Sequence, residues 1–149
     1  MVKIRNMEIK DLADVWKLGT TDLDLDSRLY HKFWDQNELF RSFTKDPEYC
    51  IVAEEEGKII GFGIGNRQAF SQSTEDIAII GWIVVHKKHR RKGVGTLLCN
   101  NLIQKLKKSG VSKIIADVES TNEASIKMLE RLSFEKSFSV HWFSKELKT

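Results

Sequence analysis

The chain of 149 residues is long enough to bury a core, and its 41% hydrophobic and 30% charged residues are typical of one soluble globular domain spanning 1–149. No stretch approaches the roughly 18 apolar residues of a membrane helix, and the N-terminus has no apolar signal segment, so we expect no membrane association. The net charge of +3 does not by itself argue for nucleic acid. Cys50 and Cys99 form no disulfide or metal framework, which predicts reduced core thiols in a cytoplasmic protein.

The first half of the chain predicts a strand, two helical regions and a hairpin. Apolar residues within 2–7 indicate a short strand, and a shared face of Leu12, Val15 and Trp16 indicates a helix that ends near Gly19. Residues 27–43 carry leucine and aromatic side chains at roughly helical spacing, typical of one broken helix or two short ones.

A hairpin is expected over residues 49–54 and 58–67, with a turn at Gly57. Its second strand carries Gly61, Gly63 and Gly65 on one face. Since glycine has no side chain, another element is expected to pack close to that face.

The centre of the chain predicts a buried strand, a basic turn and an amphipathic helix. Residues 77–85 are almost all apolar and mostly β-branched. After the turn, a four-residue spacing indicates one helix face, formed by Val94, Leu98, Leu102 and Leu106. The first turn of a helix has backbone N–H groups without partners and a partial positive charge, which together favour a bound anion. The turn therefore predicts a phosphate site.

The spacing in this turn distinguishes among phosphate-binding motifs. Neither the P-loop pattern nor the dinucleotide-binding G-x-G-x-x-G pattern is present. Arg90-x-x-Gly93-x-Gly95 instead resembles the [RQ]-x-x-G-x-[GA] signature of the GNAT superfamily of acetyl-CoA-dependent N-acetyltransferases. The resemblance implies acetyl-CoA as co-substrate and no metal, with the cofactor held by Arg90, Arg91, Lys92, Gly93, Val94, Gly95 and Thr96.

The last part of the chain predicts a strand over 112–119, a helix over 122–132 and two strands over 134–136 and 140–147. The resulting element order is similar to that of the GNAT fold over essentially the whole chain. The resemblance implies an α/β (α+β) class, with a mixed, mostly antiparallel sheet of six to seven strands, about four helices and a splayed central parallel strand pair. Exposed edges at the C-terminal strands permit a homodimer.

A second motif supports the resemblance. Residues 122–134 are similar to the N-x-x-[AS]-x-x-[LM]-Y-x-x-x-G-F segment that closes many GNAT domains, matching at Asn122, Ser125, Met128 and Phe134. In the family this helix lies along the pantetheine arm, so Asn122, Ser125 and Met128 are expected to contact the cofactor. Ser133 replaces the glycine, and Leu129 replaces the tyrosine that protonates the departing thiolate in similar enzymes.

Acetyl transfer to an amine requires oxyanion donors, a base for the amine and a proton for the sulfur. By resemblance, the donors are the backbone amides of Ile83, Val84 and Val85. Asp117 occupies the position of a strand glutamate in ribosomal-protein alanine acetyltransferases, and desolvation between apolar neighbours would favour it as the base. Glu119 lies on the same strand face and is an alternative, as are Glu75 and Asp76 acting through water. Asp117 paired with a lysine or arginine is the simpler structural interpretation.

Leucine at position 129 cannot donate a proton, so Tyr30, Tyr49, His141 or water would have to replace the tyrosine. In the aromatic region, Tyr30, Trp34 and Phe40 either pack in the core or line the acceptor groove. Core packing is the favoured interpretation.

The resemblance implies transfer of an acetyl group to a primary amine, either a peptide N-terminus or a small amine, in a ternary complex. An acidic cluster, Asp22, Asp24 and Asp26, would instead suit a polyamine. Leu129 motivates a second hypothesis, an acyl-CoA-binding module with weak or lost catalysis. The basic run 86–92 is better explained by CoA than by nucleic acid, and His86 and His89 have no third metal ligand nearby in the sequence.

Overall fold

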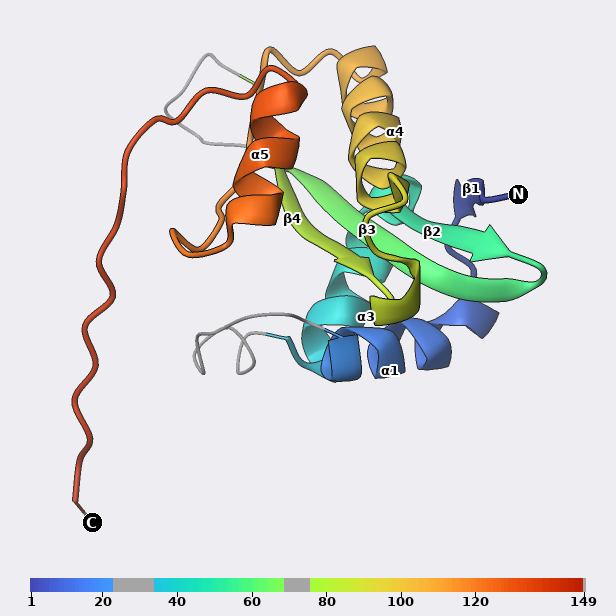
Figure 1. Cartoon of the computed structure of the whole chain (residues 1–149), viewed down its shortest axis with the longest axis horizontal. Coiled ribbons are helices and arrows are strands. Elements are labelled where there is room, and N and C mark those ends of the chain that lie inside the picture. Colours follow the sequence, from blue (N-terminus) through green and yellow to red (C-terminus); the bar gives the residue numbers. More distant parts are fainter. Residues whose placement is uncertain (23–33, 69–75, 149) are drawn as a thin grey trace.

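The computed structural model describes residues 1–22, 34–68 and 76–148, in which a five-stranded sheet lies between two layers of helices (Figure 1). The strand order is β1-β2-β3-β4-β5; β1 to β4 are antiparallel, and β5 runs parallel to β4. The expected α/β class and the central parallel pair are confirmed, although the described sheet has fewer strands than the predicted six or seven.

The elements follow the predicted order as far as α5. The strands are β1 (Lys3–Asn6), β2 (Cys50–Glu55), β3 (Lys58–Gln68), β4 (Ile77–Val85) and β5 (Lys113–Ile115). The α-helices are α1 (Leu12–Asp22), α3 (Gln36–Lys45), α4 (Val94–Lys108) and α5 (Glu123–Arg131). Three short 3-10 helices are η1 (Ile9–Asp11), η2 (Pro47–Tyr49) and η3 (Lys87–His89). None of the helices within the described residues has the length and apolar character needed to cross a bilayer.

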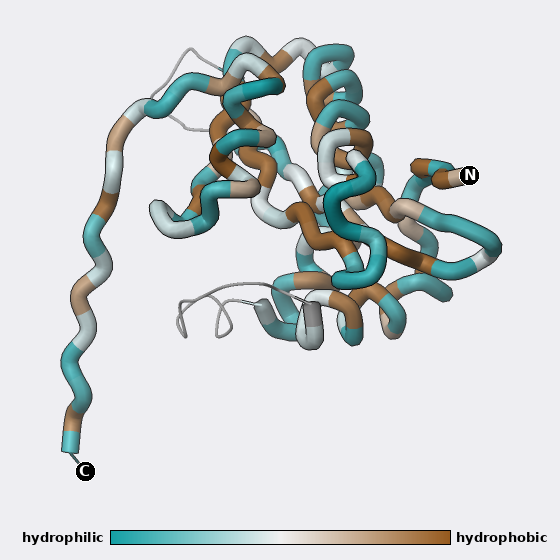
Figure 2. The backbone as a smooth tube through the Cα atoms, viewed as in Figure 1, coloured by the Kyte–Doolittle hydropathy of each residue, from teal (hydrophilic) through white to brown (hydrophobic). Residues whose placement is uncertain are grey.

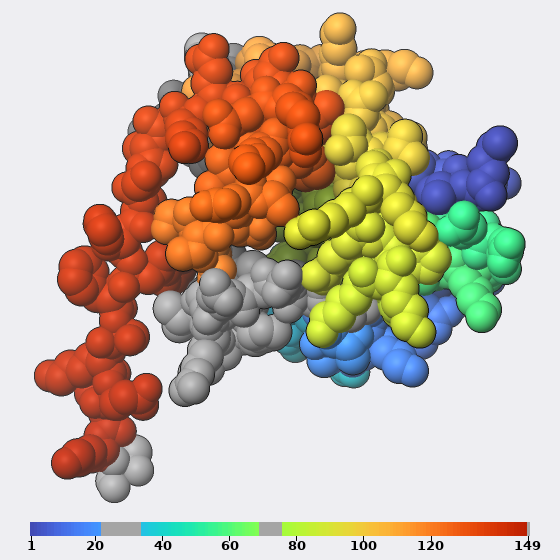
Figure 3. Space-filling model, viewed as in Figure 1, coloured from blue at the N-terminus to red at the C-terminus, as the bar shows by residue number. Residues whose placement is uncertain are grey.

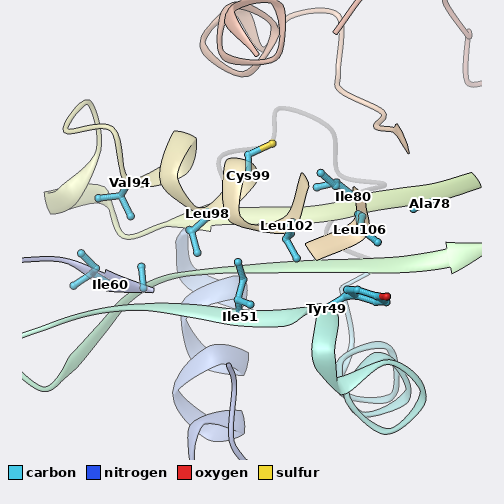
Figure 4. Close-up of a cluster of buried hydrophobic side chains, with 11 residues drawn as sticks. Tyr49, Ile51, Ile60, Ala78, Ile80, Val94, Leu98, Cys99, Leu102 and Leu106 are labelled. Atoms are coloured by element: carbon cyan, nitrogen blue, oxygen red, sulfur yellow. The ribbon is translucent and has the colours of Figure 1, made fainter. Parts of the chain in front are cut away.

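The sequence predicted that another element packs close to the glycine face of β3, and in the structure that element is α4. A Cβ at Gly61 would lie 3.1 Å from Leu98, and one at Gly63 would lie 3.1 Å from Leu102. Four helical residues rise about 6 Å and two strand residues about 6.6 Å, so a leucine at every fourth helix position meets a glycine at every second strand position. Figure 4 shows the leucines of α4 directed at the sheet among other buried residues. This match fixes α4, and with it the basic turn, close to β4.

Trp34 lies in the core on the opposite face of the sheet, beneath α1. It is 4% exposed, and its ring centroid lies 5.2 Å from that of Phe62 and 5.1 Å from that of Trp82. A Cβ at Gly19 would lie 2.4 Å from the Trp34 ring, which explains the glycine inside α1, where the sequence predicted a helix end. Core packing is therefore confirmed for Trp34. Phe40 is exposed on α3, and Tyr30 lies outside the described residues.

An ion pair closes the β1 end of the sheet. The Arg5 guanidinium donates to both carboxylate oxygens of Asp11, at 2.8 and 3.0 Å, and to Glu54 at 3.2 Å. The backbone N–H of Glu8 donates to the same Asp11 carboxylate at 2.7 Å. The hydrogen bonds from Arg5 hold the pKa of the buried Asp11 below its ordinary value, because they favour the ionised form.

Both cysteines are buried, in β2 and α4, as predicted. Burial raises the pKa of the Cys50 thiol to about 12 and that of the Cys99 thiol to about 11. Both side chains are therefore neutral thiols at physiological pH and behave as small apolar core residues.

The C-terminal predictions were partly wrong. The strand predicted over 112–119 is reduced to Lys113–Ile115, because beyond Ile115 the chain leaves β4 and has no described strand to pair with. No strand forms over 134–136 or 140–147 among the described residues. Residues 135–148 instead run away from the body as an extended tail, in which apolar and polar residues alternate (Figure 2).

Candidate functional site

A pocket lies where the parallel strands β4 and β5 separate. Their pairing ends at Ile79 and Ile115. Beyond this point, the diverging chains enclose a pocket of about 100 Å³ that α5 covers on one side. Its lining residues come from β4, α4, the segment after β5, and α5: Ile80, Gly81, Trp82, Ile83, Cys99, Ala116, Asp117, Val118, Glu119, Asn122, Ser125, Met128 and Leu129. In Figure 3, α5 and the segment leading into α4 stand on either side of this hollow.

The hydrogen-bond ladder determines which amides of β4 face the opening. The His86 N–H donates to the Ile60 carbonyl at 2.8 Å, so His86 faces β3. In an antiparallel ladder the backbone groups of successive residues point alternately to the two sides. Val84, paired with Phe62, therefore also directs its N–H toward β3, whereas Ile83 and Val85 direct theirs toward the diverging side. The sequence predicted that the amides of Ile83, Val84 and Val85 all contact the cofactor. The Val84 amide is directed toward β3 and away from the pocket, so for Val84 the prediction was wrong.

The N-terminus of α4 forms an anion-binding arrangement in continuation of β4. The helix begins at Val94 with Gly93 as its N-cap, at φ 82°. Arg91 is also left-handed, at φ 62°, so the chain turns sharply into the helix. The N–H of Leu97 is the first that returns to the Gly93 carbonyl, and the earlier amides of Val94, Gly95 and Thr96 point out of the helix end. These amides and the helix dipole favour a phosphate at this position.

Arg90 and its basic neighbours have different roles in this turn. The Arg90 Nε donates to the carbonyl of Val85 at 3.0 Å, which fastens the turn to the end of β4. Lys87, Lys88, Arg91 and Lys92 are exposed beside the helix N-terminus. The sequence predicted Arg90, Arg91 and Lys92 together as cofactor-binding cations. In the structure Arg90 positions the turn, whereas Arg91 and Lys92 are exposed.

Gly95 allows α4 to approach α5. A Cβ at this position would lie 3.4 Å from the sulfur of Met128 and 3.7 Å from Val85. Gly93, by contrast, has open space around it and requires glycine for its left-handed backbone. The two glycines of the motif are thus needed for different physical reasons.

Helix α5 forms the second wall of the pocket. Asn122 is its N-cap, because its side-chain oxygen accepts from the Ser125 N–H at 3.2 Å. Asn122, Ser125, Met128 and Leu129 all line the pocket. The structure therefore brings the second sequence motif into the same pocket as β4.

Two carboxylates lie at the pocket. Asp117 and Glu119 both line it, from the segment that follows β5. Asp117 is exposed. The sequence argument placed it in a strand, between apolar neighbours that would exclude water, but β5 ends at Ile115, before Asp117. Asp76 lies at the other end of β4, with its carboxylate 3.4 Å from Arg67, and Glu75 lies outside the described residues.

No tyrosine or histidine lines the pocket among the described residues. Leu129 occupies the place of the expected proton donor. Tyr49 is 4% exposed in the core under α4, His141 lies in the C-terminal tail, and Tyr30 is outside the described residues. The structure therefore brings none of the described substitutes to the pocket.

The histidines of the basic turn take part in local contacts. His86 caps η3 by accepting from the Lys88 N–H at 3.1 Å, and the Nδ1 of His89 lies 3.4 Å from a carboxylate oxygen of Glu55. Across residues 1–22, 34–68 and 76–148, no three His, Cys, Asp or Glu side chains gather in a way that could hold a metal ion.

Sequence reasoning missed the part of the pocket formed by Ile80, Gly81, Trp82 and Cys99. Gly81 interrupts the regular ladder between β3 and β4, where the register shifts. A glycine within an apolar strand is the signal that could have indicated this bulge.

Comparisons with known proteins agree with this geometry. Residues 9–134 match the sequence profile of the acetyltransferase (GNAT) family. An acetyltransferase of Photorhabdus laumondii is 31% identical over 98 residues, which cover 66% of this chain and 64% of the relative. An L-2,4-diaminobutyric acid acetyltransferase of Nocardia farcinica is 28% identical over 84% of this chain and 60% of its own length. The chain thus spans less than two thirds of these two relatives. An N-alpha-acetyltransferase 30 of Schizosaccharomyces pombe is 29% identical over 90% of this chain and 84% of the relative.

Solved structures share the fold at low sequence identity. Ard1 from Thermoplasma volcanium superposes with a TM-score of 0.76 at 21% identity, covering 92% of this chain and 84% of that one. The ribosomal-protein-S18-alanine N-acetyltransferase of Escherichia coli has a TM-score of 0.71 at 23% identity, covering 93% and 80%. A chain of the NatC complex bound to Gag peptide and CoA has a TM-score of 0.73 at 18% identity, covering 88% and 82%.

Proposed function

Since the chain belongs to the acetyltransferase (GNAT) family, we propose that it transfers an acetyl group from acetyl-CoA to a primary amine. The observation that carries the proposal is the continuity between the pocket at the separation of β4 and β5 and the N-terminus of α4. One strand, β4, connects an anion-binding helix end to a small, partly apolar pocket that carries two carboxylates. A long ligand with a diphosphate at one end and a reactive thioester at the other suits this arrangement.

On this proposal, the diphosphate binds the amides of Val94, Gly95 and Thr96, with Arg91 and Lys92 supplying charge. The exposed cations strengthen the attraction, and Arg90 keeps the turn in position through Val85. The amides of Ile83 and Val85 are the donors available to the pantetheine arm and the thioester carbonyl. Ser125 and Met128 of α5 close the other side.

The chemistry requires a bond between the amine nitrogen and the acyl carbon to form while the carbon–sulfur bond breaks. An acceptor that arrives as an ammonium ion loses one proton to water before it attacks and a second as the amide forms. The departing sulfur gains one proton, so the reaction releases one proton to solvent and needs no added reactant. Asp117 or Glu119, through water, receives the amine proton in this proposal. Because Leu129 cannot donate, water delivers the proton to sulfur.

The acceptor proposed is a peptide N-terminus or a small amino compound. The carboxylates at the pocket favour a cationic amine by charge. The names of two relatives point to the same two classes, an N-alpha-acetyltransferase and an acetyltransferase of diaminobutyric acid. For a polyamine, the acidic cluster would matter, but Asp24 and Asp26 lie outside the described residues.

Calorimetric titration with acetyl-CoA tests the cofactor side. Wild-type protein is expected to bind with roughly micromolar affinity, about −8 kcal/mol, and Gly93→Glu is expected to abolish binding by placing an anion at the phosphate site. Gly110→Glu is the matched control, because Gly110 also has a positive φ, at 93°, and lies beyond the opposite end of α4. Failure of the wild type to bind would refute the proposal.

Thiol release with amine substrates tests catalysis. Peptides with free N-termini, diaminobutyrate and spermidine would be compared under identical conditions. Asp117→Asn and Glu119→Gln are expected to identify the base by a roughly hundredfold fall in kcat in one of them. Equal rates in both variants and wild type would show that neither carboxylate is the base.

The second candidate function is a CoA-binding module with weak or lost catalysis, and the observation that favours it is Leu129 at the pocket. It predicts acetyl-CoA binding without thiol release for any amine. Leu129→Tyr is then expected to raise turnover, while Leu129→Phe, which lacks only the hydroxyl, is not. If the tyrosine variant is no faster, the missing proton donor does not limit catalysis.

A further inference from the structure

The pocket between β4 and β5 has a buried end with apolar walls. Two of its lining residues belong to the core, Ile80 at 4% exposure and Cys99 at 0%. Figure 4 shows the sulfur of Cys99 directed away from Leu98 and Leu102, which point at the sheet. The raised pKa of Cys99 keeps its thiol neutral. The side chains at this end therefore offer a ligand an apolar surface without charge.

The polar side chains of the pocket lie toward its open end. Asp117 is exposed, and Glu119, Asn122 and Ser125 are half-buried on the segment that leads into α5 or in its first turn. A buried water needs two to four polar partners. Since the side chains at the buried end supply only a thiol, water is held poorly there. An apolar group that replaces this water gains binding energy.

The direction of β4 places the apolar end beyond the thioester. In the proposed function, the diphosphate at the start of α4, the Val85 amide and the Ile83 amide follow one another backwards along β4. Ile80 lies three residues further in the same direction, about 10 Å at the rise of a strand. The floor of the pocket lies where the strand pairing ends, at Ile79 and Ile115. An acyl chain that continues the line of the cofactor therefore enters the apolar end.

The pocket is larger than an acetyl group. Its volume is about 100 Å³, and an apolar cavity of about 150 Å³ holds a benzene molecule with its six carbons. In proportion, the pocket has room for a chain of about four carbons, of which an acetyl group supplies half. Two lining residues leave this room: Ala116 has only a methyl group, and Leu129 is shorter than the tyrosine of the family segment.

We propose that the protein accepts acyl-CoA donors with a straight, saturated chain of up to four carbons, and that it prefers a butyryl to an acetyl group. The inference rests on the proposed function and names the class of donor that the same pocket takes. The bonds formed and broken, and the proton balance, are those of acetyl transfer. A chain that ends in a carboxylate is disfavoured, because the buried end has no partner for a charge.

Calorimetric titration with a series of acyl-CoA donors tests the inference without an acceptor. Each methylene group removed from water adds about fourfold in affinity, so butyryl-CoA is expected to bind roughly tenfold more tightly than acetyl-CoA. Hexanoyl-CoA, which is too long for the pocket, is expected to bind no more tightly than butyryl-CoA. Succinyl-CoA has the same number of acyl carbons as butyryl-CoA but ends in a carboxylate, and is expected to bind more weakly than acetyl-CoA.

The outcomes separate this inference from the proposed function. The inference alone would be overturned if acetyl-CoA or succinyl-CoA bound as tightly as butyryl-CoA, or if the affinity kept rising to hexanoyl-CoA. If the protein bound none of these donors, the proposed function would fail and the inference with it.

Two pocket variants test where the chain lies. Ala116→Leu fills the pocket from a half-buried position and is expected to bring the ratio of butyryl-CoA to acetyl-CoA affinity down to about one. Ala124→Leu is the matched control, because it makes the same change at an exposed position of α5 outside the pocket, and the tenfold ratio is expected to remain. Cys99→Ala enlarges the buried end and is expected to shift the preference to pentanoyl-CoA. A ratio that neither pocket variant changes would refute the inference.

Discussion

The two parts of the chain on either side of residue 110 differ in how they are held. Every buried side chain among the described residues lies at or before Leu106, whereas β5, α5 and the tail contain none. The first part closes its own core from both faces of the sheet, with α4 on one and α1 and α3 on the other. The second part rests on this core through half-buried residues such as Met128 and Leu132.

This difference suggests a division of tasks. The pocket lies between the two parts, with β4 and α4 forming its rigid wall and α5 its more exposed wall. For the function proposed above, the site would admit a long cofactor and an acceptor. One fixed wall and one less tightly packed wall would suit this task, since local opening is easiest where few buried contacts are lost.

The largest effect is expected from Leu102→Ala. Leu102 is fully buried between α4 and β3, and its truncation is expected to lower the free energy of unfolding by about 2–5 kcal/mol. Leu132→Ala, in the second part, removes the same atoms from a half-buried site and is expected to cost less. Urea denaturation followed by circular dichroism measures both. Equal losses would contradict the contrast between the two parts.

Gly61→Ala is expected to cause the next largest loss of stability. Its Cβ would lie 2.9 Å from the Val84 carbonyl and 3.1 Å from Leu98, so backbone or helix must shift, at about 1–3 kcal/mol. Gly81→Ala is the matched control, because the nearest atom to its Cβ is the Ile64 carbonyl at 3.8 Å. The control is expected to leave the thermal midpoint unchanged or raise it. A stable Gly61→Ala variant would show that α4 packs less closely than described.

Arg5→Ala tests the ionic closure of the first part. The variant removes both hydrogen bonds from Arg5 to the buried Asp11 carboxylate and keeps the one from the Glu8 N–H, at an expected cost of about 1–2 kcal/mol at pH 7. Because the folded-state pKa of Asp11 is lowered, this stabilisation is complete above the unfolded value of about 3.9 and is lost as pH falls through the folded pKa. The difference between wild type and variant is therefore expected to shrink below about pH 4. A difference that stays constant into acid would argue against an ionic origin.

The smallest effect is expected from Asn122→Ala, at the start of α5. Loss of the cap to the Ser125 N–H is expected to cost about 1 kcal/mol of stability. Asn122→Asp, which also caps, is expected to restore it. Hydrogen exchange is expected to show the loss in α5 and not in α4. A loss shared by both helices would mean that the two parts unfold as one unit.

The fold was predictable where short-range patterns determine it. The apolar run of β4, the four-residue spacing of α4 and the glycine stripe of β3 each specify a local geometry, and all three were confirmed by the structure. The turn into α4 was also predictable, because Gly93 and the helix start are adjacent in sequence. The prediction of strands over 134–136 and 140–147 was wrong, because an alternating pattern indicates a strand but cannot provide its partner.

The strand–turn–helix unit, and the resemblance of two motifs to one family, could be recognised without a structure, because helix and strand periods and turn residues act over a few positions. The folded chain was needed to show where β4 and β5 separate, which amides of β4 face the pocket, and that Asp117 is exposed. These features depend on pairing between segments far apart in the chain. The register of a strand is set, and water is excluded from its side chains, only when those segments meet.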